Sequence, residues 1–235
     1  MGSVTASQPF RDGSGRSLSD YPRPSVAVDT ALMTVARGDA AKAPYLGVLL
    51  VRRPAEPSRQ SSNSQGWALP GTFLHEGETL AHAVRRSLGE KASVTGREPQ
   101  QLHVFDDPAR DDRGWVLSVA HLDVLAFDEL EALRRPSDAR IGRVPTKLRL
   151  PYDHASIIEL AVERLRREYR AMPDPRHLLP DAFTIADLRI VHEAVAGTAL
   201  QKDTFRRLMI DQLVELPDES VGRVGRPARL FARRR

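Results

Sequence analysis

Short runs of apolar residues in the first half of the chain predict β-strands. The segments 26–35 (VAVDTALMTV) and 45–52 (YLGVLLVR) are rich in valine and leucine, which favour strands. Residues 101–105 form another short run, and residues 115–127 alternate between apolar and polar side chains over a longer distance. We therefore expect a strand in each of these segments.

Helical periodicity appears between and after these strands. Residues 79–90 carry an apolar stripe at helical spacing, residues 128–135 suit a short helix, and residues 152–169 suit a longer one. The longer helix would turn these side chains inward: Ile157, Ile158, Ala161, Leu165 and Tyr169. Polar loops over 54–66 and 106–114 separate the elements.

The pattern changes after residue 170. Residues 171–180 (AMPDPRHLLP) are rich in proline and read as a linker. Thr184, with Asp187 three residues later, resembles a helix cap, and Gly197 would end that helix. A second helix follows over 201–213, with Phe205, Leu208 and Met209 on its apolar side, and residues 223–232 look like a basic hairpin with Gly225 at the bend. Helix, turn, helix and hairpin is the outline of a winged helix-turn-helix.

Composition narrows the class of protein. The 235 residues contain no cysteine, which excludes disulfides and thiolate chemistry and suits a reducing cytoplasm. No apolar run approaches the length of a membrane span, so we expect no membrane association. Residues 1–24 are rich in Ser, Arg, Gly and Pro and lack the apolar core of a secretory signal; we expect a disordered leader there.

Positive charge gathers at the C-terminus. The net charge is only +4, but residues 221–235 contain six arginines and no acidic residue. A basic chain end of this kind is typical of nucleic-acid contact, although a solvated, disordered tail has the same composition.

A motif with recognisable spacing begins at Leu69. The stretch 69–91 is similar to a Nudix box, G-x5-E-x7-R-E-U-x-E-E-x-G-U, in which U is aliphatic. Residues at the box's first Gly, first Glu, Arg and aliphatic positions are Thr72, Glu78, Arg86 and Leu88. The three carboxylates that follow in the box fall on Ser87, Glu90 and Lys91, so one survives and one is replaced by a cation.

This replacement has a chemical consequence. Positions 87, 90 and 91 are i, i+3 and i+4, which share one face of a helix, where Nudix hydrolases gather oxygen ligands for magnesium. A lone Glu90 beside the Lys91 ammonium group is a poor divalent-cation site, because the lysine repels the metal and competes for the carboxylate. We therefore expect no metal and no catalytic residues, and a domain that binds a nucleotide without cleaving it.

Two further segments extend the resemblance. Residues 150–158 (LPYDHASII) look like a D-H-A-x-I-I helix opening, and the run from Phe183 to Phe231 includes a G-R-P-A wing at 225–228. Together with the box, these segments resemble the Nudix-related transcriptional regulators of NAD metabolism in bacteria, the NrtR family, over about residues 25–235.

The resemblance implies an α+β fold in which a Nudix-type α/β/α sandwich with a mixed sheet precedes a winged helix-turn-helix. The implied division is a leader at 1–24, a Nudix-like effector-binding domain at 25–170, a linker at 171–180 and a DNA-binding domain at 181–235. The linker lies where a rearrangement between the two domains could be absorbed.

The resemblance also implies a function. A homodimer would bind operators of NAD-synthesis or salvage genes and repress them, and ADP-ribose or a related NAD metabolite would bind the Nudix domain and release the DNA, with no other cofactor required. The alternative is an active hydrolase of ADP-ribose-type nucleotides with an appended basic domain. An RNA-binding regulator has only the basic tail in its favour, because RNA-recognition aromatics on strands are missing.

Candidate DNA contacts lie on the second C-terminal helix and on the wing. Cations on the helix project away from its apolar side, which suits entry into a major groove, although an ordinary solvated helix face has the same pattern. Arginines on the wing would hold phosphates or enter a minor groove. The candidates are Lys202, Thr204, Arg206, Arg207, Arg223, Arg226 and Arg229.

Candidate effector contacts follow from the box and from the loop that the family fold places near it. Arg110 and Arg113 would clamp a diphosphate, while Phe105 or Trp115 would either stack on an adenine or belong to the core. We expect Arg86 to pair with Glu78 and His154 to be a cap or packing residue. The complete set is Arg52, Glu78, Arg86, Glu90, Lys91, Phe105, Arg110 and Arg113.

Overall fold

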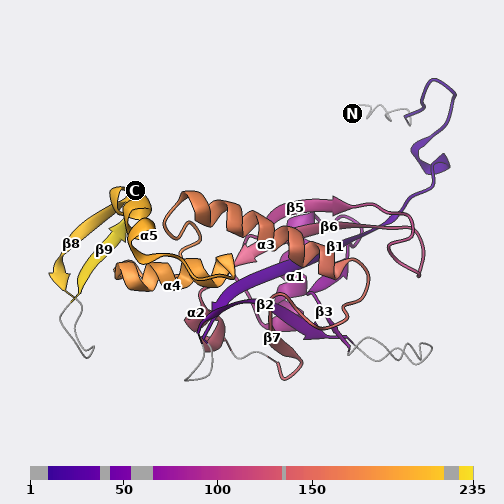
Figure 1. The fold of residues 1–235 in the computed structure, drawn as a ribbon. Coiled ribbons are helices and arrows are strands. Elements are labelled where there is room, and N and C mark those ends of the chain that lie inside the picture. The colour runs from indigo at the N-terminus through magenta and orange to yellow at the C-terminus, as the bar shows by residue number, and fades with distance from the viewer. Residues whose placement is uncertain (1–9, 38–42, 54–65, 134–135, 220–227, 235) are drawn as a thin grey trace, which may run out of the picture.

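A seven-stranded sheet and a two-stranded sheet organise the computed structural model, which describes residues 10–37, 43–53, 66–133, 136–219 and 228–234. The larger sheet lies between helices, and the smaller one lies at the C-terminal end of the molecule beside two further helices (Figure 1). The chain is therefore an α+β protein with the two parts expected from its sequence.

The larger sheet is mixed, as expected. Its strands are β1 (Ser25–Ala36), β2 (Tyr45–Arg52), β3 (Trp67–Ala68), β4 (Gly71–Phe73), β5 (Gln100–Phe105), β6 (Val116–Val124) and β7 (Ala139–Arg143). The order is β3-β2-β1-β6-β5, with β4 paired to β1 and β7 paired to β2. Strands β1 and β6 run parallel, whereas the other pairs are antiparallel.

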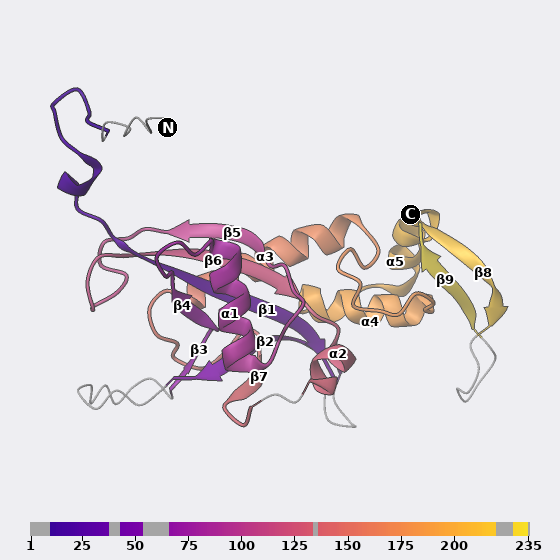
Figure 2. The same cartoon turned by 180° about the vertical axis from the view of Figure 1, so that it is seen from behind.

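Helices cover both faces of this sheet. Helix α3 (His154–Ala171) lies on one face, and α1 (Leu80–Ala92) lies on the other, as the two opposite views show (Figures 1 and 2). The short helix α2 (Phe127–Ala132) follows β6 near one end of the sheet. This is the expected α/β/α sandwich.

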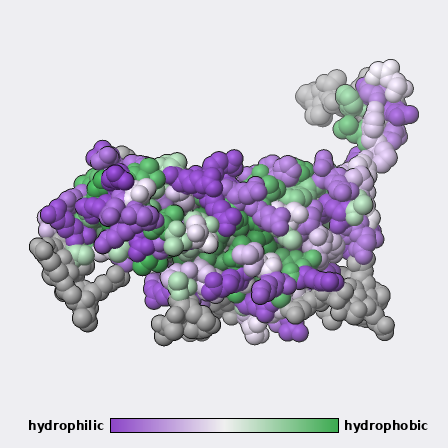
Figure 3. Space-filling view, in the orientation of Figure 1, coloured by the Kyte–Doolittle hydropathy of each residue, from purple (hydrophilic) through white to green (hydrophobic). Residues whose placement is uncertain are grey.

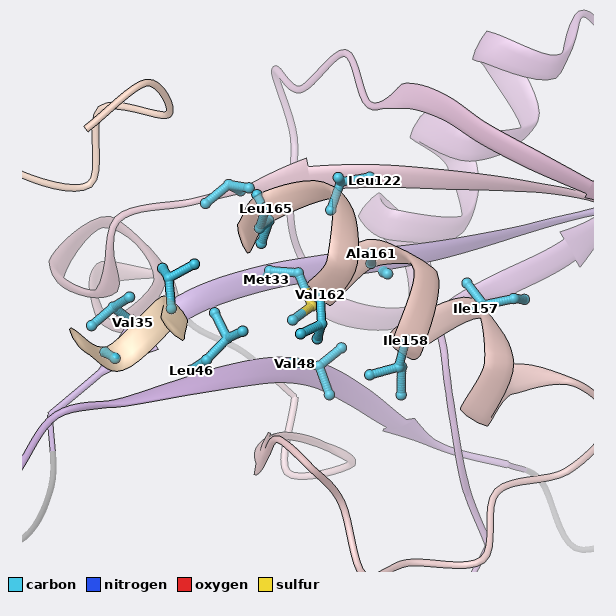
Figure 4. Close-up of a cluster of buried hydrophobic side chains, with 14 of the residues drawn as sticks. Met33, Val35, Leu46, Val48, Leu122, Ile157, Ile158, Ala161, Val162 and Leu165 are labelled. Carbon is cyan, nitrogen blue, oxygen red and sulfur yellow. The ribbon is translucent and has the colours of Figure 1, made fainter. Parts of the chain in front are cut away.

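Alternation along β1 explains why both faces are apolar. Met33 and Val35 pack with the α3 residues, whereas Val28 and Leu32 pack with the α1 residues, since successive side chains of a strand point to opposite faces. Figure 4 shows the α3 side, where side chains of the helix pack against residues of β1 and β2. The buried strand therefore reads as a nearly continuous apolar run.

The C-terminal part is a winged helix. It consists of α4 (Ile185–Ala196), α5 (Lys202–Met209), a 3-10 turn η2 (Ile210–Gln212) and the paired strands β8 (Leu213–Glu219) and β9 (Arg229–Arg233). Thr184 caps α4 and forms the expected capping box with Asp187, and Gly197 ends α4 in a left-handed conformation. Its own small core contains Phe183, Leu188, Phe205, Met209, Leu213 and Phe231.

The wing differs from its predicted form. The second helix was expected to run to Leu213, but α5 ends at Met209 and Leu213 instead begins β8. The hairpin predicted within 223–232 is longer, because β8 pairs with β9 across residues 220–227, which lie outside the described residues. Leu208 was assigned to the apolar side of the helix; that assignment is wrong, since Leu208 is 56% exposed.

Several boundaries in the first part also differ. The predicted strand 115–127 ends at Val124, and Phe127 begins α2 rather than ending the strand. Strands β3, β4 and β7 were not predicted, because two to five residues are too few to show a period.

The proline-rich segment after α3, predicted as a linker, is closely held. Asp174 is fully buried and accepts hydrogen bonds from the Tyr169 hydroxyl (2.9 Å), the Arg233 guanidinium (2.5 Å) and the backbone N–H groups of Leu178 and Leu179 (2.9 Å each). One carboxylate therefore ties α3, the following segment and β9 together.

Helix α4 packs against both parts of the chain. Its residues Val191, Ala194 and Val195 belong to the same core cluster as α3 and the central strands, while Leu188 belongs to the core of the winged helix.

Residues 10–24, the described part of the predicted disordered leader, form a local turn and a 3-10 helix η1 (Leu18–Asp20) that lie away from the sandwich (Figures 1 and 3).

Candidate functional site

A cavity of about 470 Å³ opens where β1, β4 and the C-terminal end of α1 meet the loops before β6 and α3. Its lining mixes charged groups of both signs with aromatic rings, the combination that suits a nucleotide. The polar and aromatic lining residues are Asp29, Arg52, Arg53, Thr72, Phe73, Glu90, Lys91, Arg110, Asp111, Arg113, Asp138, Tyr152 and His154.

Asp29, on β1, provides a buried negative charge at this cavity. Its carboxylate accepts a hydrogen bond from Ser118 (2.6 Å) and lies 3.3 Å from His154 Nε2 and 3.6 Å from Arg110 Nη2. Burial raises the pKa of Asp29, but His154, Ser118 and Arg110 outweigh burial and leave this pKa below its ordinary value. The carboxylate is therefore ionised at neutral pH.

His154 has a defined tautomer at the start of α3. Its Nδ1 accepts a hydrogen bond from the backbone N–H of Leu69 (3.0 Å), so in a neutral ring Nε2 carries the proton and faces Asp29. The side chain thus links the segment before the box to β1. His154 is not the N-cap of α3, which is Asp153, and its side chain also lines the cavity.

Arg110 lines the cavity, but its guanidinium is already engaged. It makes two hydrogen bonds to the Asp153 carboxylate, at 2.8 and 2.6 Å, and its side chain is only 3% exposed. The predicted diphosphate clamp by Arg110 stays a prediction: the residue lines the cavity, and two of its donors are bound to the residue before α3.

Arg113 and Tyr152 form one wall. Arg113 makes two hydrogen bonds to Asp111, at 2.9 and 2.7 Å, and its guanidinium lies 4.8 Å from the centre of the Tyr152 ring and 5.1 Å from that of Phe73. Arg53 lies 5.3 Å from the Tyr152 ring centre. Rings held between arginines in this way offer stacking surfaces for a base.

The rings predicted to stack on adenine are elsewhere. Phe105 packs against the main core cluster, as the alternative reading expected, and Trp115 is 47% exposed. Neither contributes to the cavity. The sequence did not single out Phe73 or Tyr152 for this role.

Glu78 and Arg86 form the ion pair expected from the box. Arg86 donates to both Glu78 oxygens (2.9 and 2.8 Å), and it also donates to Thr72 Oγ1 (3.1 Å) and the Phe73 carbonyl (3.0 Å). The hydrogen bonds from Arg86, and a further one from the backbone N–H of His75, lower the pKa of Glu78 to about 2. The pair fastens α1 to β4, and neither residue lines the cavity, so their predicted effector contacts stay predictions.

The three positions at the degenerate end of the box do not form a magnesium site. Ser87 is a fully buried residue of α1, whereas Glu90 and Lys91 line the cavity. The Lys91 ammonium group donates to the Gly71 carbonyl; burial lowers the pKa of Lys91, while Asp29 and Glu90 oppose that shift. One carboxylate beside one ammonium group is a donor set that does not fit the six oxygen ligands of magnesium.

The predicted DNA-contacting residues of α5 share the exposed surface of that helix. Lys202, Thr204, Arg206 and Arg207 are exposed, while Phe205 and Met209 are buried against the winged-helix core. Within the part of the chain that the structure describes, neither Arg206 nor Arg207 forms an ion pair. Their guanidinium groups are therefore available to a polyanion.

The wing supplies one described candidate. Arg229 on β9 donates to Glu215 on β8 (2.8 Å), and both side chains are exposed. Arg223 and Arg226 lie outside the described residues. The structure therefore leaves the proposed wing contacts of Arg223 and Arg226 as predictions.

Asp29 was not among the predicted site residues, although the sequence indicates its importance. It is an acidic residue inside an otherwise apolar, buried strand, and such a charge requires partners. Its partners come from β6, the loop before it and α3, so no local spacing could have revealed them.

Two sequence families match the chain. The Nudix domain family matches residues 27–155, and the NrtR DNA-binding winged helix domain matches residues 175–232. A Nudix sandwich joined to a DNA-binding winged helix defines a class, the Nudix-related transcriptional regulators. Within that class, the chain belongs to the NrtR family.

The similar proteins of known function include both a repressor and an enzyme. The chain is 31% identical, over 91% of its length and 83% of the relative's, to the ADPR-responsive transcriptional repressor NtrR of Acinetobacter baylyi. It is also 31% identical to an ADP-ribose pyrophosphatase of Methanocaldococcus jannaschii, over 59% of this chain and 73% of that one. The repressor matches both parts of the chain.

A solved regulator has the same architecture. The crystal structure of Shewanella oneidensis NrtR is 30% identical, covers 89% of this chain and 94% of its own, and gives a TM-score of 0.69. That protein has also been solved with a 27mer DNA (TM-score 0.68, 30% identity, 89% of this chain and 93% of that one covered). Its Nudix domain has been solved with ADP-ribose (TM-score 0.50, 28% identity, 65% of this chain and 95% of that one covered).

Among the described residues, no helix is long and apolar enough to cross a bilayer.

Proposed function

We propose that this chain is a transcriptional repressor of NAD-synthesis or salvage genes that binds operator DNA through α5 and the wing and senses ADP-ribose in its Nudix cavity. The A. baylyi repressor responds to ADPR, and the Shewanella regulator has been solved with DNA and with ADP-ribose. By analogy, nucleotide binding would release the operator.

One observation carries the effector half of the proposal. The cavity brings Arg52, Lys91 and Arg113 together with the rings of Phe73 and Tyr152. Cations beside stacking surfaces match the diphosphate and the adenine of ADP-ribose. The Asp29 and Glu90 carboxylates can accept hydrogen bonds from ribose hydroxyls.

Lys91 is the residue that distinguishes sensing from hydrolysis in this proposal. Its ammonium group lies at a former metal-ligand position and would offset the diphosphate charge without a cation. Isothermal calorimetry with ADP-ribose in EDTA tests this: the wild type should bind, and Lys91→Glu should bind at least about tenfold more weakly, since each repulsive charge pair costs about 1 kcal/mol or more. Binding by the wild type only with magnesium would contradict it.

The proposal also holds that the protein is not an enzyme and requires no cofactor. AMP release from ADP-ribose, assayed with magnesium and with manganese, separates it from the alternative hydrolase. Turnover at rates typical of enzymes, above about 1 per second, would establish the alternative. The double variant Ser87→Glu/Lys91→Glu is the matched comparison, because it restores the carboxylates of the box.

A homodimer completes the proposal. Two winged helices on a pseudo-palindromic operator double the contact surface and fix the half-site spacing. Sedimentation equilibrium of the protein and of its operator complex should give two chains per duplex. We assign residues 25–170 to the effector domain and 181–235 to the DNA-binding domain within each chain.

A further inference from the structure

A second hollow, of about 340 Å³, lies between the end of α3 and helix α5. One side is formed by the last turns of α3 and includes Arg166 and Arg170. The other side is formed by α5 with its N-cap Gln201, and includes Thr204 and Leu208. Residues of the Nudix-like part and of the DNA-reading helix therefore share one surface.

The arginines of α3 differ in whether they form ion pairs. Arg164 is paired with Glu168 at 2.7 Å, and Glu168 is paired with Arg176 as well. Arg170, in the last turn, is exposed and has no ion pair within the described part of the chain. Arg166 donates to the Val195 carbonyl (3.2 Å) at the end of α4. Arg166 and Arg170 are i and i+4, so they lie on one side of α3.

The same end of α3 is fixed relative to α5. The Tyr169 ring lies 5.0 Å from that of His192, and the His192 ring lies 5.0 Å from that of Phe205 on α5. The Tyr169 hydroxyl also donates to buried Asp174. This packing holds the arginines at a set position beside the recognition helix.

On this geometry we propose that Arg170, supported by Arg166, binds the phosphate backbone of the same duplex that α5 reads. A duplex with α5 in its major groove presents a phosphate chain along each side of that helix. The side of α5 that carries Thr204 faces the hollow, so the backbone on that side passes over the end of α3.

The position of Arg170 indicates that its partner is a DNA phosphate. Arginine binds phosphate oxygens through two parallel donors, and an exposed guanidinium with no protein partner is available for that bond. A phosphate contact positions the duplex without reading its sequence. The inference rests on the proposed function, because it requires that α5 bind DNA.

Salt dependence of duplex binding tests the inference. A duplex selected from a random pool by the wild-type protein is used beside a scrambled duplex, with fluorescence anisotropy at several salt concentrations. Arg170→Ala should weaken binding to both duplexes by the same factor, roughly five- to tenfold at 0.1 M salt, and should lower the slope of log Kd against log salt by about 0.9. Arg170→Lys, which keeps the charge, should retain the slope.

The matched control is Arg164→Ala, which removes one positive charge from the same helix at an ion-paired position. It should leave the slope at the wild-type value. A wild-type slope in Arg170→Ala, or an equal decrease in Arg164→Ala, would overturn the inference while leaving the proposed function intact. If the wild type selects no duplex at all, the proposed function fails and the inference fails with it.

Discussion

His192 is buried at the junction between the two parts of the molecule. It is 2% exposed, its ring packs against those of Tyr169 and Phe205, and its Nε2 accepts a hydrogen bond from the backbone N–H of Asp174 (3.3 Å). Burial lowers the pKa of His192 to about 4, and the nearby Asp174 charge only partly opposes that shift. The residue is therefore neutral in the folded protein down to acidic pH.

This pKa predicts a pH-dependent stability. Between pH 6.5 and about 4 the unfolded chain binds a proton at His192 and the folded chain does not, so the free energy of unfolding decreases as the pH falls through this window. The loss should approach about 3 kcal/mol. Urea unfolding of His192→Gln, which cannot titrate, should show a correspondingly smaller decrease, while His82→Gln, at an exposed histidine of α1, should follow the wild type. Equal decreases in all three proteins would contradict the assignment.

At the scale of elements, the short strand β4 determines how the box meets the sheet. Gly71 in β4 faces Asp29 in β1, and a Cβ atom at Gly71 would lie 2.0 Å from Asp29 Oδ1 and 2.9 Å from the Val28 carbonyl. No side chain fits there without moving β4 away from β1. The glycine is required by this close approach, not by its backbone angles.

Gly71→Ala should therefore destabilise the fold by about 1–3 kcal/mol and weaken ADP-ribose binding, because β4 carries Phe73 into the cavity wall. Gly89→Ala is the matched control on α1, where the nearest atom to the new Cβ is Thr95 Cγ2 at 3.9 Å. Relief of a helical glycine should stabilise that variant by about 0.5–1 kcal/mol. Thermal unfolding and calorimetry measure both effects, and an unchanged melting temperature in Gly71→Ala would contradict the close contact.

Strong periodicity made most of the elements predictable. Buried strands β1 and β2, the box helix α1, α3 and the capped helix α4 all carry long apolar patterns, and their positions agree with the prediction within a few residues. The start of strand β8 was not predicted, because Leu213 continues the apolar spacing of α5. The helical pattern placed Leu213 at the end of the second helix, but this residue is the first of β8 and is buried in the winged-helix core.

The site was predictable where chemistry is local and not where it depends on distant partners. The Glu78–Arg86 pair follows from spacing within one motif. By contrast, the pairing of Arg110 with Asp153 was not predicted, because Asp153 is distant in sequence and lies beside it only in the folded chain. Tyr152 became an aromatic wall only through its two flanking arginines from separate loops.

At the scale of the whole molecule, α3 connects the two functional surfaces. His154 and its neighbour Asp153 contact the cavity region at one end, and Tyr169 contacts the winged helix at the other. An 18-residue helix spans about 27 Å, and a packed helix moves as a unit. Coupling then requires only that the nucleotide favour an arrangement of α3 and α5 other than the one that binds DNA.

The DNA-reading surface yields a prediction at the same scale. Arg206→Ala/Arg207→Ala should weaken operator binding roughly 100-fold or more at physiological salt, because such contacts contribute about 1–3 kcal/mol each, and should leave the unfolding transition unchanged. The double variant Arg37→Ala/Arg85→Ala removes equal charge from exposed ion pairs of the Nudix-like part and should retain binding. Unaltered mobility shifts with the α5 variant would place the DNA elsewhere.

The most direct test is a titration of ADP-ribose into the complex of the protein with its operator in EDTA, followed by fluorescence anisotropy of the DNA and by chromatography of the nucleotide. The account predicts that the operator is released in proportion to bound ADP-ribose and that the nucleotide is recovered intact. An operator complex that is indifferent to ADP-ribose, or DNA release only when a divalent metal is added and the nucleotide is cleaved, would contradict it.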